Sequence, residues 1–199
     1  MPDDISPGQE AGQADRPLRA DARRNWAAIL AAAEEVFSRR GTSASTEEVA
    51  ARAGVAIGTV FWHFPTKDAL LRAMMKDLLA RLAGEAQTLI REGDPATALL
   101  QFFSRVVEQA AARKTVADLL ASEGIGLQAG GPVATLRQEL TTLLGAAQQA
   151  GTVRPEVGTA EVMALLAATS DAALRSGWDH DLQRRTLAII FSGLRPAGR

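Results

Sequence analysis

The chain has 199 residues, of which 47% are hydrophobic and 23% charged, and its formal net charge is −1. This composition fits one globular domain, or a small module joined to a larger one, and excludes nucleic-acid binding driven by overall positive charge. The absence of cysteine excludes disulfides, thiolate-bound metals and cysteine nucleophiles. Residues 1–15 are acidic, unlike a signal peptide, and no run approaches the ~20 apolar residues of a membrane span. We therefore expect a soluble cytoplasmic protein with no membrane partner.

Helix-forming residues dominate the sequence and predict an all-α fold. Only 5% of the residues are aromatic, none is Tyr, and β-branched residues form no alternating run. Residues 1–15 are expected to form a disordered acidic tail, because they combine charge with Pro and Gly. Helices are expected over residues 21–39, 46–53, 57–64, 94–113, 115–122, 132–150, 159–176 and 179–194, with a long helix starting after Thr66. Loops are expected over 124–131 and 151–158.

Residues 45–64 have the pattern of a helix-turn-helix. Ser45 and Glu48 match a capping box, Gly54 supplies a turn, and Pro65 closes the second short helix. The second helix of such a unit enters the major groove of DNA. An ordinary helical hairpin has the same local pattern, so these residues alone favour neither interpretation.

The second short helix has two distinct faces. Val60 and Phe64 are four residues apart and are expected to face the core. Thr59, Trp62 and His63 share the opposite face, and an exposed Trp–His pair favours a partner surface over plain solvent.

The stretch Ala53-Gly54-Val55-Ala56-Ile57-Gly58-Thr59-Val60-Phe61-Trp62-His63-Phe64-Pro65-Thr66-Lys67-Asp68-Ala69-Leu70-Leu71 resembles the DNA-binding signature of the TetR family of bacterial transcriptional regulators. The resemblance covers about Asp21 to Leu71, roughly a quarter of the chain. It implies a three-helix head with a helix-turn-helix over residues 16–77. It also implies a helical ligand-binding and dimerisation body over residues 78–199, and a homodimer.

The resemblance implies a set of DNA-binding residues. By position these are Thr59, Phe61, Trp62 and His63 against the DNA, Ile57 and Gly58 at the start of the recognition helix, and Thr46 and Lys67 at phosphates. Two of them depart from the common pattern. Ile57 is apolar where a polar residue is frequent, and Phe61 replaces Tyr, which removes a hydroxyl contact.

The charge distribution supports a DNA-binding head. Residues 16–77 contain ten basic and seven acidic residues, a balance of +3, against −4 for residues 1–15. Arg16, Arg19, Arg23 and Arg24 cluster at the first helix, where they either reach phosphates or the minor groove, or form a solvated face.

Two sequence patterns resemble a dinucleotide site and a metal site, but neither predicts a real site. Residues 124–129 match the loose dinucleotide pattern G-x-G-x-x-A, but no strand precedes them. His180 lies between Asp179 and Asp181, where Asp179 is expected to cap the last helix and no second His is near. We therefore expect no cofactor and no metal.

The body is expected to hold a small-molecule effector and the dimer interface, although most of its apolar residues must be core. An apolar pocket is predicted among Phe102, Phe103, Val106, Leu119, Leu120 and Leu140. The last two helices carry the apolar stripes Val162, Leu165, Leu166 and Thr169, and Leu187, Ile190, Phe191 and Leu194, which predict a four-helix dimer bundle. Packing within one chain must account for part of both stripes.

We interpret the sequence as a ligand-responsive transcriptional regulator, a repressor that binds a palindromic operator on double-stranded DNA as a dimer and is released by a small molecule. A helical enzyme is the first rival, but the chain has two His, no Cys and no nucleophile–base signature. A second rival is a helical partner-binding protein that has lost sequence-specific DNA binding. The Ile57 and Phe61 departures keep that alternative open.

Overall fold

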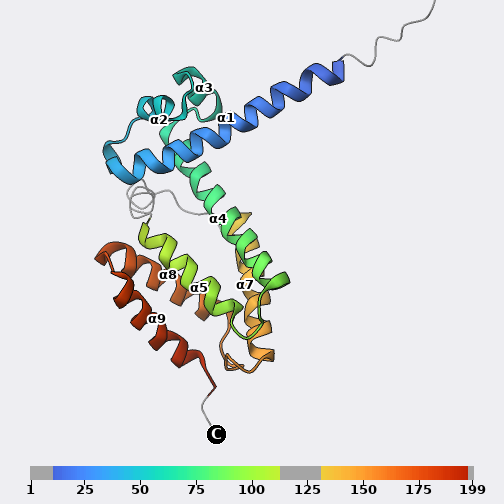
Figure 1. The fold of residues 1–199 in the computed structure, drawn as a ribbon, viewed down its shortest axis with the longest axis vertical. Helices are drawn as coiled ribbons and strands as arrows, with labels where there is room; N and C mark the ends of the chain where they lie inside the picture. The colour runs from blue at the N-terminus through green and yellow to red at the C-terminus, as the bar shows by residue number, and fades with distance from the viewer. Residues whose placement is uncertain (1–10, 113–130, 197–199) are drawn as a thin grey trace, which may run out of the picture. The chain divides into compact units, whose positions relative to one another are not determined.

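A computed structural model describes residues 11–112 and 131–196 of the chain (Figure 1). Within these ranges the regular secondary structure is entirely helical, which confirms the all-α prediction. The helix expected over 115–122, most of the loop expected over 124–131, and Leu119 and Leu120 lie outside the described residues.

The described residues form eight α-helices and one short 3-10 helix. Their bounds are α1 Ala11–Arg40, η1 Gly41–Ser43, α2 Thr46–Ala53, α3 Ile57–His63, α4 Lys67–Glu92, α5 Ala98–Ala112, α7 Pro132–Gln149, α8 Thr159–Ser176 and α9 His180–Leu194. By backbone contacts the chain divides into two compact units, Met1–Met74 and Met75–Arg199, which are called the head and the body below.

Two helix starts differ from the sequence prediction. Helix α1 begins at Ala11, ten residues before Asp21, and takes in the end of the expected tail. The Pro and Gly residues behind the tail prediction cluster mainly before Ala11, whereas Ala and Gln follow it and favour helix. Helix α5 begins at Ala98 instead of Asp94, because Asp94 first closes a turn by accepting the Ala96 N–H on its carboxylate at 3.0 Å.

The head has its own apolar core. Helix α1 packs against α2 and α3, and α2 packs against α3. The fully buried side chains include Ile29 and Phe37 of α1, Val49 of α2 and Val60 of α3. Trp26 of α1 is half-buried, with its ring centroid 6.2 Å from that of Phe64.

The body core is built mainly on α5. Helix α5 packs against α8 and α7, and Phe102, Phe103 and Val107 of α5 are fully buried there. Leu140 and Leu143 of α7 fill the same core. None of the described helices is long and apolar enough to cross a membrane.

One amide fixes the loop between α7 and α8. The Gln148 Nε2 donates to the main-chain carbonyls of Arg154, Pro155 and Val157 at 3.2, 3.3 and 2.8 Å. The Arg154 N–H in turn donates to the Leu194 carbonyl at 2.9 Å, which joins the loop to the end of α9. The predicted loop over residues 151–158 is therefore held from two sides.

Candidate nucleic-acid interface

The start of α2 is fixed by the predicted capping box. The Ser45 Oγ accepts the Glu48 N–H at 3.2 Å, and the Glu48 carboxylate accepts the Ser45 N–H at 3.1 Å. These bonds satisfy two main-chain donors that a helix start otherwise leaves open. The helix therefore begins at a defined residue, and the turn after it follows at a defined place.

Gly54 makes the turn between α2 and α3. Its φ of +69° lies in the left-handed region that favours glycine. The Val55 N–H reaches back to the Ala50 carbonyl at 3.1 Å, which closes the end of α2. Helix α3 then starts at Ile57 without a side-chain cap. Its orientation depends on Val60, which is fully buried against the head core.

The outer face of α3 exposes apolar and aromatic side chains. Trp62 is 73% exposed, Phe61 44% and Ile57 38%. The Trp62 ring meets the His63 ring edge-on with centroids 4.6 Å apart. Thr59 and His63 are half-buried. Val60 and Phe64 are buried on the other face, as predicted, whereas of the three residues predicted to face outward only Trp62 is exposed.

The remaining predicted contacts lie near the ends of α3 and its neighbours. Gly58 is exposed, and a Cβ added to it would meet nothing within 4 Å, so another surface can approach the backbone closely there. Thr46 is half-buried in the first turn of α2. Lys67 is half-buried in the first turn of α4, with its Nζ 5.5 Å from the centroid of the Phe37 ring.

Ion pairs join α1 to α2 behind this surface. The Glu35 carboxylate pairs with Arg52 at 2.5 Å and with Arg39 at 2.7 Å, and Arg40 pairs with Glu48 at 3.2 Å. The hydrogen bond from Arg52 lowers the pKa of Glu35 below its usual value, with the positive charges of Arg52 and Arg39 acting in the same direction. The pairs of Arg52 with Glu35 and of Arg40 with Glu48 were not predicted from the sequence, because they depend on how α1 and α2 cross.

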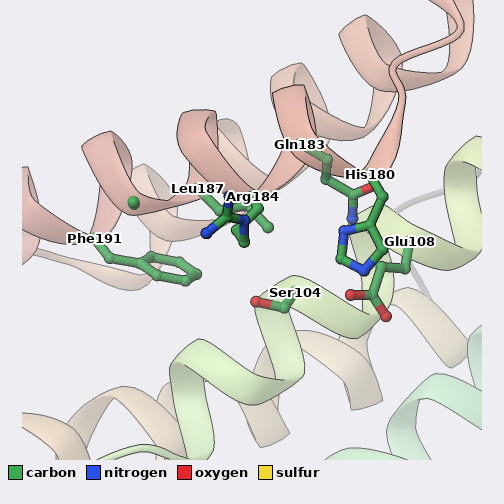
Figure 2. Close-up of a pocket in the computed structure, with 8 residues that line it drawn as sticks. Ser104, Glu108, His180, Gln183, Arg184, Leu187 and Phe191 are labelled. Carbon is green, nitrogen blue, oxygen red and sulfur yellow. The ribbon is translucent and has the colours of Figure 1, made fainter.

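The residues predicted to line an effector pocket sit in the body core. Phe102, Phe103 and Leu140 are buried, and Val106 packs partly against them. Leu119 and Leu120 lie outside the described residues, so the pocket stays a prediction. The structure has a different cavity of about 240 Å³ between α5 and α9, which sequence reasoning missed (Figure 2). No local pattern signals it, because its lining comes from two helices far apart in the sequence.

Most of the residues predicted at the dimer interface pack within the single chain. Val162, Leu166, Thr169, Leu187 and Leu194 are buried, and Leu165, Ile190 and Phe191 pack partly against the body core. The apolar side chains that α9 leaves exposed are instead Leu182, at 40%, and Ile189, at 74%. The sequence pattern could not separate these roles, because both faces of α9 carry apolar residues.

A capped short helix, a left-handed glycine turn and a second short helix with an exposed aromatic face, accompanied by a separate helical body, define the class of helix-turn-helix regulators. The family model described as "Bacterial regulatory proteins, tetR family" matches residues 29–74. The family model described as "Transcriptional regulator SbtR-like, C-terminal domain" matches residues 94–196. The chain belongs to the TetR family.

Similar proteins agree with this assignment. A TetR transcription regulatory protein from Mycobacterium vanbaalenii, known as a crystal structure, is 39% identical, with a TM-score of 0.71 over 90% of this chain and 100% of that one. The HTH-type transcriptional repressor Rv3405c of Mycobacterium tuberculosis is 34% identical over 76% of this chain and 70% of its own. A probable HTH-type transcriptional regulator, ArpR of Pseudomonas putida, is 33% identical over 106 residues. This match covers 50% of the present chain and 50% of ArpR.

Proposed function

We propose that this protein is a ligand-responsive transcriptional repressor that binds a palindromic operator as a homodimer and leaves it when a small molecule binds the body. The observation that carries the proposal is the outer face of α3, where Trp62 is 73% exposed beside Thr59 and His63. A surface of this kind fits the major groove, where the recognition helix of a helix-turn-helix reads base edges. The relative named as a repressor supports the sign of regulation.

Different residues of the head are expected to contact the bases and the phosphates of DNA. Thr59 has a hydroxyl that can donate to or accept from a base edge, and Ile57 can contact a thymine methyl. Thr46 and Lys67 lie in the first turns of α2 and α4, where a phosphate is favoured by the open main-chain N–H groups. Base contacts therefore come from α3, and register on the duplex comes from the flanking helix starts.

Dimerisation follows from the small size of the recognition helix. Helix α3 has seven residues and reads only a few base pairs, so two half-sites about 34–36 Å apart are needed for a specific operator. We assign the dimer contact to α8 and α9, and of these two helices α9 exposes the large apolar side chains Ile189 and Leu182. Exposed apolar side chains of this kind lose contact with water when a second copy packs on them.

The mechanism of release is a population shift. DNA binding requires one separation of the two α3 helices, and an effector that binds better to another separation lowers DNA affinity. Linkage makes the effect reciprocal, so operator DNA weakens effector binding by the same factor. Helix α4 carries Lys67 at its start and Leu82 of the body core further along, so it is the element through which the change passes.

The first experiment is selection of duplexes from a random-sequence DNA pool by the purified protein at near-physiological salt. We expect a palindrome with half-sites about one helical turn apart. Affinity for the selected duplex should fall with salt, with a slope near −0.9 per phosphate contacted. Recovery of no consensus, with or without candidate effectors, would instead favour a partner-binding protein that has lost specific DNA binding.

Two variants separate base reading from phosphate contact. Lys67→Ala should weaken binding to selected and random duplexes alike, and should reduce the salt slope by about 1. Thr59→Ala should weaken the selected duplex more than random DNA, because it removes a base-directed hydroxyl. Equal losses on both kinds of DNA for Thr59→Ala would count against its reading role.

A third variant tests the dimer surface. Ile189→Asp places a charge on the exposed face of α9 and should shift the protein toward monomer in sedimentation velocity. Ile90→Asp is the matched control, because Ile90 is also exposed but lies on α4. A dimer unaffected by Ile189→Asp would move the interface away from this face.

A further inference from the structure

A cleft between α5 and α9 has a polar end and an apolar end (Figure 2). Glu108 of α5 and His180 and Gln183 of α9 gather at one end, and Phe191 of α9 lies toward the other. The cavity volume of about 240 Å³ lies just below the ~300–1,000 Å³ of pockets for drug-sized ligands. The cleft therefore suits a small organic molecule with one polar head.

Gln183 is one of the polar residues that line the cleft. The residue is only 6% exposed, and its side-chain amide makes no hydrogen bond with any residue of the described chain. The amide is not among the fully buried, unsatisfied side-chain groups of the described residues, so it reaches the solvent that enters the cleft. A molecule in the cleft can therefore displace that solvent and form a hydrogen bond with the amide.

The unpaired charge in the cleft is negative. Arg184, the cation in its wall, is already paired with Asp181 at 2.7 Å. Glu108 is an exposed residue and forms no ion pair within the described residues. An ionised carboxylate accepts hydrogen bonds and donates none, so the group it recognises is a donor, and best a cationic one.

The other end of the cleft accepts an apolar group. Leu187 and Phe191 line it, and Phe191 is held in place by an edge-on contact with Phe103, with ring centroids 5.6 Å apart. A preformed aromatic wall suits an aromatic or branched aliphatic group, which gains from leaving water.

We propose that the α5–α9 cleft binds a small amine, with its ammonium group on Glu108 and Gln183 and its apolar part against Leu187 and Phe191. The Gln183 amide oxygen accepts from the same ammonium, and the Ser104 hydroxyl and His180 ring supply further polar contacts at the rim. This site goes beyond the proposed function and differs from the core pocket predicted around Phe102 and Leu140. Its occupation requires no DNA, so its test is independent of operator binding.

The test uses three probes of the same shape and different charge on the full-length protein. They are 2-phenylethylamine as a cation, 2-phenylethanol as a neutral molecule and phenylacetate as an anion, each titrated by calorimetry at pH 7. We expect saturable binding of the amine, at least tenfold tighter than that of the alcohol and carboxylate, because a hydrogen bond to a charged group contributes about that factor. Equal binding of the three probes, or no saturable amine binding, would overturn the proposal.

Variants then place the amine in the cleft. Glu108→Gln should weaken amine binding at least tenfold, whereas Glu92→Gln, an exposed glutamate at the end of α4, should leave it unchanged. Ala188→Phe should block the probe by filling the cleft from an exposed position on α9. Unchanged melting temperatures verify that the three variants fold. Amine binding that survives both Glu108→Gln and Ala188→Phe would place the probe elsewhere and refute the assignment.

Discussion

Removing the Trp62 side chain should weaken DNA binding strongly and leave folding nearly intact. A Trp side chain contributes ~150–250 Å² of surface, and 73% of Trp62 is exposed, which leaves roughly 110–180 Å² for a partner to cover. At ~25 cal/mol per Å² this area sets an upper limit of about 2.8–4.5 kcal/mol on the contact. Because protein–DNA interfaces are wet and ordering has a cost, we expect Trp62→Ala to lose about 1–2 kcal/mol per head, or roughly 5- to 30-fold in affinity.

Fluorescence anisotropy with the selected duplex measures the affinity, and thermal unfolding measures the stability. The ring contact between Trp62 and His63 is the one aromatic contact recorded for Trp62 within the described residues, so unfolding should change by about 1 kcal/mol or less. Ile90→Ala removes an exposed apolar side chain from α4 and should change neither quantity. Full DNA affinity in Trp62→Ala, or a loss of stability above ~2 kcal/mol, would refute the reasoning.

Three further predictions concern folding. Ser45→Ala should lower the free energy of unfolding of the head by about 1 kcal/mol because it removes a helix cap, and Ser45→Asp should retain it; equal denaturation midpoints for the two variants would contradict the capping role. Phe102→Ala should cost about 3–5 kcal/mol in urea unfolding, because the ring is fully buried, and a loss below ~1 kcal/mol would contradict its place in the core. The lowered pKa of Glu35, caused by Arg52, stabilises the head above about pH 4.5, and this contribution is lost as the pH falls through the lowered pKa. The urea midpoint should therefore fall less between pH 6 and pH 3 for Glu35→Gln than for the unchanged protein. An equal fall in both proteins would contradict a stabilising role of the ionised Glu35 carboxylate.

The sequence predicts local features of this fold well and distant ones poorly. The capping box at Ser45, the glycine turn at Gly54 and the two faces of α3 follow from spacing alone, because each depends on residues within one or two helical turns. The α8 bounds, Thr159–Ser176, also agree with the prediction, since Glu161 accepts the Gly158 N–H at its start.

Features that join distant segments were not predictable in this way. The stripes on α8 and α9 fit equally well against a second copy and against the body core, and only the folded chain shows that Leu166 and Leu187 are buried within it. The α5–α9 cleft is lined by residues such as Glu108 and Gln183, which are separated by the whole of α7 and α8. Helical periodicity identifies an apolar face but not the element that covers it.

The hydrogen bonds of the Gln148 side chain to the α7–α8 loop determine which substitutions the loop tolerates. This one amide fixes the path of three main-chain carbonyls between Arg154 and Val157, and main-chain groups are the same whatever side chains the loop carries. The exposed loop positions Arg154, Pro155 and Glu156 are therefore free to diversify, whereas Gln148 is not. Even Gln148→Glu, which keeps the size, would set a carboxylate against three carbonyl oxygens and release the loop.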